Sequence, residues 1–465
     1  MFAIPGIIAL VVFIYARPQE FFERLQVVPL LYLFFGLALY GLLIDVRVGN
    51  LRLRATPQLG WVVAFLLYAS LTVLIRAPSD AFGHILSLSV CVALYALLAH
   101  GVQSFRALHV VAGTVLVMVL LVCGVGAHQG FAPTGCVVID ETTRGDNASG
   151  KPDGRSCENV RSCYLGDAEP GAEYVCEHIG LLGTTSVGRG RVRYRGVLQD
   201  PNELALAGGV GLPLAFALGR VPKKSLSRHL VVALTVALVV LCAILTGSRS
   251  GQLVFLAVLG IYFLKRFGLR GLLVAGTAAL PLLLLGGRSG EEATSSTTER
   301  IDCWMEALSM WRSHPLIGVG LGQFGEYHYL TAHNSYLLTL AELGLPGMLL
   351  FSILIYISLK VPFSVLRHVP ATVTEPSAAE SIARPWAMAL LAAFAGLGVG
   401  IFFLSFAYHY VLWIYLGLSG ALFSAVKAHD PSFRVRFGLR DFALVVAADV
   451  GIILTVYLYT RWALR

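Results

Sequence analysis

The sequence predicts an all-α integral membrane protein, a polytopic bundle of about thirteen (12 to 14) transmembrane helices. Of its 465 residues, 57% are hydrophobic and 13% are charged, whereas a soluble domain carries about 25% charged residues. The mean hydropathy is +0.75. The third observation is the length of the apolar segments, because a helix needs about 20 mostly apolar residues to cross a bilayer. Together these features exclude a soluble enzyme, a disordered protein and a peripheral protein with a single anchor.

Thirteen apolar segments meet or approach this length. The first, sixth and eighth are short or rich in glycine, which gives the range of 12 to 14. Residues 2–16 have no positively charged segment before them and no small-residue cleavage site before Arg17, so they predict a first span and not a cleaved signal peptide. The predicted spans are residues 2–16, 28–46, 58–75, 82–100, 107–126, 203–219, 229–246, 251–264, 271–287, 335–359, 386–407, 410–426 and 442–460.

The charged residues predict the orientation of these spans. The net charge of +8 is better explained by positive loops on the cytoplasmic side of a membrane than by binding to nucleic acid. With the N-terminus inside, the short cytoplasmic loops hold eighteen Lys and Arg residues, and the short outer loops hold four. Two long segments, 127–202 and 288–334, then lie outside. They separate three groups of helices, in residues 1–126, 203–287 and 335–465.

Half of the eight cysteines lie in the first long outer segment, at Cys136, Cys157, Cys163 and Cys176. Four cysteines outside the cytoplasm predict two disulfides, with three possible pairings. A zinc site is the alternative, but no C-x-x-C pair supports it, and the lone acid-x-acid pattern at 167–169 is too weak to predict a metal. The other four cysteines are expected to be buried and unpaired: Cys91, Cys123 and Cys242 within spans, and Cys303.

Four arginines alternate with other residues in R-G-R-V-R-Y-R-G, at Arg189, Arg191, Arg193 and Arg195. In an extended strand all four point to one face, which would form a concentrated anion site. A solvated strand or a contact with lipid headgroups is the alternative. Arg195 leads directly into G-V-L-Q-D-P-N (196–202). Asp-Pro-Asn is typical of a turn and here precedes a span, so Arg195 is expected at the membrane surface.

A fifth arginine, Arg249, lies in T-G-S-R-S-G (246–251), the tight turn between two predicted spans. A charge at the rim of a membrane usually faces a cavity or a partner. The alternative is a side chain that extends to the headgroups, but the Gly and Ser residues on both sides favour a functional role.

Residues 298–311 (T-E-R-I-D-C-W-M-E-A-L-S-M-W) carry apolar side chains at helical spacing, after residues that are typical of a helix start. They predict a helix along the membrane interface, with its two tryptophans at headgroup level. Arg300 would open this helix, where its charge is unfavourable with the helix dipole, so an anionic partner is expected to compensate. A salt bridge to Asp302 or Glu306 is the alternative.

The glycine-rich G-V-G-L-G-Q-F-G (318–325) follows no strand, so it predicts a close-packed, lipid-facing turn and not a dinucleotide-binding loop. His333 ends the second outer segment, in H-N-S-Y-L-L-T-L-A-E-L-G-L-P-G (333–347). Asn334 and Ser335 can cap the span that follows. A lone histidine is often structural, but one beside several arginines at a rim is a candidate general base.

Four motifs in order resemble the O-antigen ligase and O-antigen polymerase superfamily. They are R-G-V-L-Q-D-P-N (195–202), T-G-S-R-S-G (246–251), R-I-D-C-W…H-P-L-I-G-V-G-L-G-Q-F (300–324) and the segment that starts at His333. The resemblance covers residues 195–360, and no family pattern is apparent in the amino-terminal half or the cysteine-bearing segment. It implies a GT-C-type membrane glycosyltransferase in a bacterial inner membrane, with an active site that faces the periplasm. The loop charges predict the cytoplasmic N-terminus.

Members of this superfamily transfer a glycan from an undecaprenyl-pyrophosphate carrier to an acceptor, without a metal or another cofactor. The resemblance implies that Arg195 and Arg249 engage the pyrophosphate, that His333 activates the acceptor hydroxyl, and that Arg300 is a further substrate contact. The expected partners are the lipid-linked glycan donor, a glycan or lipid A-core acceptor, and the bilayer. Four more residues of the same rim are predicted to bind substrate: Arg191, Arg193, Asn202 and Asn334.

The resemblance favours a ligase modestly over a polymerase. His333, Asn334, Gly344 and Gly347 fit the ligase pattern of His-(Asn/Ser/Gln) followed after nine residues by G-x-x-(Gly/Thr/Tyr), whereas the R-x10-G pair of some polymerases is absent from both outer segments. A polymerase and a protein O-oligosaccharyltransferase remain alternatives within the superfamily. The competing class is a transporter or flippase of polyprenyl-linked glycans, but transporters gather polar residues at mid-membrane, and here they gather at the outer rim.

Overall fold

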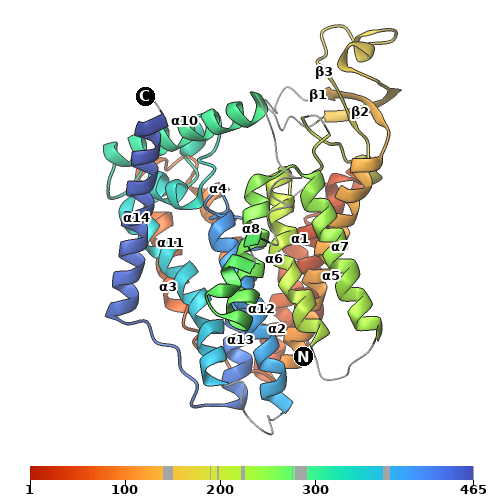
Figure 1. Ribbon diagram of the computed structural model, residues 1–465. Coiled ribbons are helices and arrows are strands. Elements are labelled where there is room, and N and C mark those ends of the chain that lie inside the picture. Colours follow the sequence, from red (N-terminus) through yellow and green to blue (C-terminus); the bar gives the residue numbers. More distant parts are fainter. Residues whose placement is uncertain are drawn as a thin grey trace.

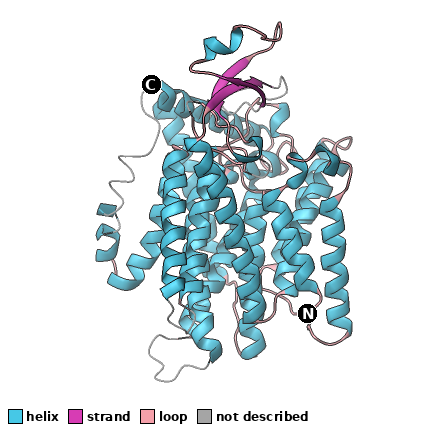
Figure 2. Ribbon diagram, turned by 90° about the vertical axis from the view of Figure 1, so that its right-hand side faces the viewer, coloured by secondary structure: helices cyan, strands magenta, loops and turns pink. Residues whose placement is uncertain are grey.

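The computed structural model is a bundle of long helices with a small β-sheet at one end (Figures 1 and 2). It describes residues 1–139, 150–188, 190–195, 198–220, 226–274, 276–277, 291–369 and 378–463. Within these residues, twelve helices are long and apolar enough to cross a membrane. They are α1 (Ala3–Ala16), α2 (Leu30–Arg47), α3 (Leu59–Arg76), α4 (Ala81–Gly101), α5 (Phe105–Phe131), α6 (Pro201–Gly219), α7 (Leu226–Leu245), α8 (Arg249–Phe267), α11 (Ser335–His368), α12 (Ala378–Gly400), α13 (Tyr410–His429) and α14 (Leu439–Ala463).

These helices confirm the predicted fold class. An α-helix satisfies its backbone N–H and C=O groups internally, so apolar segments of this length adopt it in lipid. Twelve of the thirteen predicted spans coincide with a described helix. The other, residues 271–287, lies mostly outside the described residues, so this span stays a prediction.

The bundle has two distinct ends. The N-terminus lies at one end, and the β-sheet and the end of α14 lie at the other, which we call the sheet end (Figure 1). Helix α10 (Glu291–Ser313) lies across the sheet end and is not among the twelve apolar helices. The described parts of the two long segments that the loop charges place outside therefore lie at the same end of the molecule.

Helix α12 packs against α6, α8 and α11 in the middle of the bundle. Two glycines one turn apart allow this close approach, as in the small-xxx-small pattern of membrane helices. A Cβ atom added to Gly400 would lie 2.4 Å from Leu206 of α6 and 3.0 Å from Val254 of α8, and one added to Gly396 would lie 2.8 Å from Val258. These contacts fix the end of α12 between the second turns of α6 and α8.

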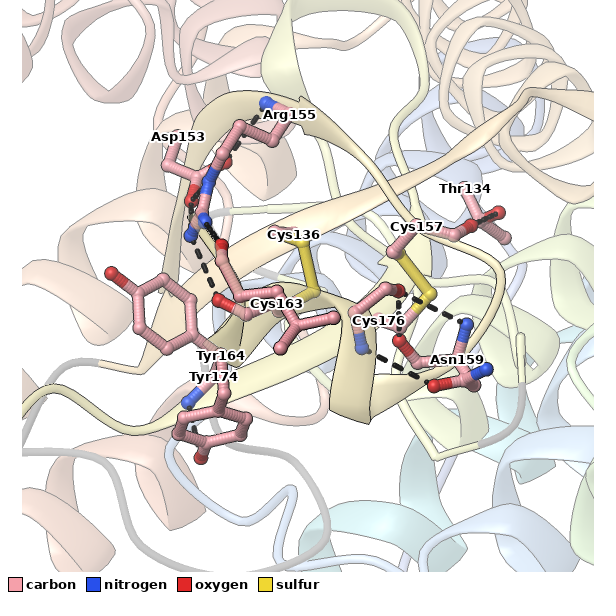
Figure 3. The surroundings of a disulfide bond; sticks show 12 residues. Thr134, Cys136, Asp153, Arg155, Cys157, Asn159, Cys163, Tyr164, Tyr174 and Cys176 are labelled. Atoms are coloured by element: carbon pink, nitrogen blue, oxygen red, sulfur yellow. Dashed lines mark hydrogen bonds and ion pairs between the residues drawn. A yellow bond between two sulfur atoms is a disulfide. The ribbon is translucent and has the colours of Figure 1, made fainter. Parts of the chain in front are cut away.

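The sheet has three antiparallel strands in the order β2–β1–β3, formed by β1 (Thr134–Ile139), β2 (Gly150–Ser156) and β3 (Tyr174–His178). Two disulfides hold it, Cys136–Cys163 and Cys157–Cys176 (Figure 3). The prediction of two disulfides is confirmed, and the structure selects one of the three pairings. The sulfur atoms of the zinc alternative are used in these bridges.

Arg155 links several segments of the disulfide-bonded sheet and the loop beside it (Figure 3). Its guanidinium pairs with Asp153 at 2.6 Å, donates to the carbonyl oxygens of Leu165 (2.9 Å) and Cys163 (3.0 Å), and lies 5.1 Å from the ring centre of Tyr174. The apolar core of this sheet is small, so the two disulfides supply stability that the core cannot supply.

The glycine-rich turn at 318–325 packs into a kink of α11 at Gly344, where φ is +71°. A Cβ atom on Gly344 would lie 2.1 Å from the carbonyl oxygen of Leu316, and one on Gly318 would lie 2.4 Å from the backbone of Glu342. Only glycine fits at such distances. The turn is close-packed as predicted, but it is buried against α3 and α11 and does not face lipid.

Candidate functional site

Three helices begin together at the sheet end, around the end of α12. Leu206 and Val254, in the second turns of α6 and α8, both lie against Gly400. The backbone N–H of Ser335, the first residue of α11, donates to the carbonyl oxygen of Ile401 at 2.8 Å. The starts of α6, α8 and α11 therefore surround one point, each within about one and a half helical turns of it.

Asn202 joins two of the predicted motifs. Its side-chain oxygen accepts a hydrogen bond from the hydroxyl of Ser248 at 2.6 Å, and its amide nitrogen donates to Asp200 at 2.8 Å. Asp200 and Ser248 are the N-caps of α6 and α8. Asn202 is itself buried, so we assign it the role of fixing these two helix starts against each other.

Arg249 is the first residue of α8, and its side chain is exposed. The N-terminus of a helix carries about half a positive charge, which disfavours a cation there and favours an anion. Two further helix N-termini point to the same region. The start of α8 can lie this close to α6 because residue 251 is glycine. A Cβ atom added to Gly251 would lie 2.4 Å from the Cβ of Ala205. Arg249 thus lies where an anionic ligand would relieve the unfavourable charge.

Two of the alternating arginines are buried and bind backbone oxygens from separate segments. The Nε of Arg191 donates to the carbonyl oxygen of Thr246 at 3.0 Å, and Arg193 binds the carbonyl and hydroxyl oxygens of Thr185 at 3.0 and 3.2 Å. The predicted concentrated arginine face is therefore corrected at these positions, because buried carbonyl groups need donors. Arg189 lies outside the described residues.

Arg193 and Arg195 lie near enough at the sheet end for their charges to interact. Burial lowers the pKa of Arg193 to about 10, and the neighbouring charge of Arg195 acts in the same direction, while Glu177 and Asp200 act in the opposite direction. Burial also lowers the pKa of Arg195, against the effect of Glu20. A guanidinium that is poorly solvated and next to a second cation gains from a bound anion.

Arg195 is half-buried, and its Nη2 donates to the carbonyl oxygen of Gly150 at 2.9 Å. Gly150 is the first residue of β2 and pairs with Ile139 of β1. A Cβ on Gly150 would lie 1.9 Å from the carbonyl oxygen of Val138, so this strand start is held tightly. The disulfide-bonded sheet therefore contacts the guanidinium that the resemblance assigns to pyrophosphate binding.

The double substitution Cys157→Ser/Cys176→Ser should lower turnover strongly, and it should lower the unfolding temperature of the helix bundle only slightly. Loss of one bridge from a small element costs about 2–5 kcal/mol, and this bridge joins β3 to the residue that follows β2, so the Gly150 carbonyl loses its fixed position. Turnover and thermal unfolding of one preparation measure the two effects. Dithiothreitol, which reduces both bridges of the sheet, should lower the wild-type activity at least as far as the double substitution does. Full activity of the double variant would contradict the coupling.

His333 has a left-handed backbone conformation, with φ at +47°. Such a conformation is uncommon for a residue other than glycine and marks a position that its surroundings hold firmly. The side-chain oxygen of Asn334 caps α11 by accepting from the N–H groups of Tyr336 and Leu337 at 2.9 and 3.0 Å, as predicted. Asn334 is fully buried. It therefore fixes the start of α11 next to His333, which is half-buried.

Residues 401–406 bind the residues on both sides of His333, and no motif marks them in the sequence. The hydroxyl of Ser335 donates to the carbonyl oxygen of Leu404 at 2.6 Å and accepts from the N–H of Phe406 at 2.7 Å. The hydroxyls of Thr331 and Ser405 also form a hydrogen bond. This turn comes about 70 residues after His333 in the chain, so no local signal in the sequence connects the two.

Glu342 is a second residue that sequence reasoning missed. Its carboxylate lies inside an apolar span and is buried, and it accepts from the N–H of Phe324 at 3.2 Å. It fixes the glycine-rich turn against α11. An acidic residue within a span is rare and usually has a specific partner, which is the signal that could have found it.

Arg300 does not open a helix, contrary to prediction. Helix α10 starts at Glu291 and continues through the polar residues that resemble a cap; the hydroxyl of Thr298 bonds within the helix to the carbonyl of Thr294 at 3.1 Å. The guanidinium of Arg300 lies 5.9 Å from the ring centre of Phe403. Trp304 is buried against protein, which corrects its placement at headgroup level.

One comparison with known families bears on these residues. Residues 230–352 match the family model described as O-antigen ligase. The match spans α7, α8, α10 and the first half of α11, and it includes Arg249, Arg300 and His333. It leaves out the disulfide-bonded sheet and the arginines that precede α6. No curated protein matches the chain. Residues 230–352 of this multi-pass membrane protein therefore form a domain that is similar to O-antigen ligase, and this match supports the O-antigen ligase and polymerase superfamily.

Proposed function

We propose that the protein transfers a glycan from undecaprenyl pyrophosphate to lipid A-core on the periplasmic side of a bacterial inner membrane, with inversion at the anomeric carbon and without a metal. The observation that carries this proposal is the meeting of three helix N-termini at the sheet end, with Arg249 at the first position of one and His333 just before another. The disulfides of the same end support an oxidising compartment.

The arginines and helix N-termini serve the donor. Breaking the bond from the anomeric carbon to the phosphate oxygen leaves the electron pair on pyrophosphate. Guanidinium groups form paired, charge-assisted hydrogen bonds with phosphate oxygens, and helix N-termini bind the same oxygens through their N–H groups. Arg249 and Arg195 are assigned to this role, and Arg193 and the helix dipoles contribute to the potential around it. Arg300 is assigned to a substrate contact.

His333 serves the acceptor. Its neutral imidazole accepts the proton of the acceptor hydroxyl as that oxygen forms the new bond to the anomeric carbon. Attack from the face opposite the leaving pyrophosphate inverts the configuration in one displacement. The imidazolium then releases its proton to water. A ligase is favoured over a polymerase by the spacing of His333, Asn334, Gly344 and Gly347.

A reconstituted assay tests this proposal. The protein in nanodiscs is incubated with undecaprenyl-pyrophosphate-linked glycan and lipid A-core, in the presence of EDTA. The expected result is glycan attached to lipid A-core through the opposite anomer, with release of undecaprenyl pyrophosphate at an unchanged rate after chelation. A longer glycan on the carrier lipid would instead make the protein a polymerase. Movement of the intact donor across proteoliposomes, with no new glycosidic bond, would make it a transporter.

A further inference from the structure

A cavity of about 340 Å³ opens at the sheet end between α10, the turn after α12 and α14. Four of its nine lining residues are aromatic, and its charged group is Arg300. We call it the α10–α14 pocket and use five of its lining residues below: Arg300, Trp304, Phe402, Phe403 and Tyr459. The volume lies in the range of sites for small ligands, which are typically apolar with a few polar groups that orient the ligand.

The aromatic rings of the pocket form one packed cluster around Trp304. Its ring centre lies 5.9 Å from that of Phe402 and 6.0 Å from that of Tyr459, both in edge-on contact. Trp304 is 7% exposed, and its indole N–H has no hydrogen-bond partner within the described part of the chain. A buried donor without a partner is unfavourable, and a hydroxyl group of a bound ligand would satisfy it.

The pocket is joined directly to the segment of the candidate base. Phe402 and Phe403 follow Ile401, whose carbonyl oxygen accepts from Ser335 at 2.8 Å. Ser335 is two residues from His333. With 3.8 Å between successive Cα atoms, Phe402 lies within about 17 Å of His333 along this path. An oligosaccharide can extend over such a distance while one of its hydroxyls lies at the imidazole.

The walls of the pocket come from two parts of the chain. Arg300 and Trp304 lie inside the matched domain, as do Arg249 and His333, whereas Phe402, Phe403 and Tyr459 lie beyond residue 352. Arg249 and His333 therefore belong to the shared segment, whereas Arg195 and the part of the pocket formed by α14 and the turn after α12 do not. Residues outside a shared segment are where members of a family can differ in the substrate that they select.

We propose that the α10–α14 pocket binds a sugar residue of the acceptor glycan, an inference that rests on the proposed function. A pyranose presents apolar C–H faces and a rim of hydroxyl groups. Aromatic walls match its faces, the Trp304 N–H matches a hydroxyl, and Arg300 at the same site suits a hydroxyl or an acidic substituent. Helix α10 is polar and is not among the described helices that are apolar enough to cross a membrane, so this wall of the pocket favours a sugar over a lipid chain.

Two substitutions test the pocket through acceptor kinetics. Tyr459→Ala removes an exposed aromatic ring that lines the pocket. Trp304→Phe keeps a buried aromatic ring at this position but removes the indole N–H. Each should raise the KM for lipid A-core about tenfold, which corresponds to about 1.4 kcal/mol, and should leave kcat and the donor KM nearly unchanged. Leu458→Ala is the matched control, because Leu458 precedes Tyr459 on α14, is 63% exposed and does not line the pocket.

The outcomes separate the pocket from the proposed reaction. A rise in donor KM in place of acceptor KM would assign the pocket to the isoprenoid chain and overturn the inference, as would unchanged kinetics in both variants. Binding of delipidated core oligosaccharide, measured by calorimetry on His333→Ala protein, should weaken by the same factor when Tyr459→Ala is added. If the wild type transfers no glycan but this binding difference persists, the pocket stands and the proposed reaction fails. If the wild type transfers glycan without any binding difference, the reaction stands and the pocket fails.

Discussion

Replacement of His333 by alanine should lower turnover by about 10²–10⁴-fold, the usual contribution of a positioned general base. Donor binding should be nearly unchanged, because the pyrophosphate is assigned to arginines and helix N-termini at the starts of α6 and α8. The wild-type rate should also fall on acidification, since only the neutral imidazole accepts a proton, and the variant should lose this dependence. Carrier-lipid binding, turnover against pH and thermal unfolding of one preparation measure all three effects.

His333→Asn separates a catalytic role from a structural one. The backbone of His333 has φ at +47°, a conformation that asparagine tolerates better than alanine. A structural role therefore predicts that the asparagine variant is stable and active. The catalytic role predicts a stable variant that is as slow as the alanine variant. His128→Ala is the matched control, because His128 is an exposed histidine near the end of α5 at the sheet end, and its loss should not change the rate.

The fold was predictable from the sequence because lipid imposes a single rule on every span. Apolar length alone located the helices, and the predicted cap at Asn334 marks the start of α11. The caps at Asp200 and Ser248 are seen only in the structure. The same local reasoning failed at α10. Its polar residues resembled a cap, but inside the helix they bond to their own backbone, and only the complete helix shows that Arg300 lies within it.

The candidate site was predictable only in part, since its chemistry and its geometry come from different kinds of information. Motifs identified Arg249 and His333. The burial of Arg191 and Arg193 depends on carbonyl groups of Thr246 and Thr185, which only the folded chain brings near. The pairing of the four cysteines likewise depends on contacts that only the folded chain makes. Cys136 lies opposite Cys176 in the sheet, yet each bonds to a cysteine outside that strand pair.

Arg249→Ala should lower transfer by about 10²–10³-fold, the cost of removing a donor that stabilises developing charge, and Arg249→Lys should be nearly as damaging. An ammonium group keeps the charge but cannot form the paired hydrogen bonds of a guanidinium with phosphate oxygens. If the side chain only extends to the headgroups, lysine would serve equally well. Wild-type activity of the lysine variant would therefore eliminate the pyrophosphate clamp. Arg266, at the opposite end of α8, provides the matched pair of substitutions, and neither should affect the rate.

The stability of Arg249→Ala gives the sharper distinction. Arg249 occupies the first position of α8, where the helix dipole makes its charge unfavourable by about 0.3–1 kcal/mol. A residue that supports the fold would show loss of activity together with loss of stability. If Arg249 instead binds an anionic substrate, its substitution should lower turnover strongly, and the unfolding temperature should stay the same or rise slightly. Added pyrophosphate should then raise the unfolding temperature of the wild type more than that of Arg249→Ala, because ligand binding stabilises only the form that binds it.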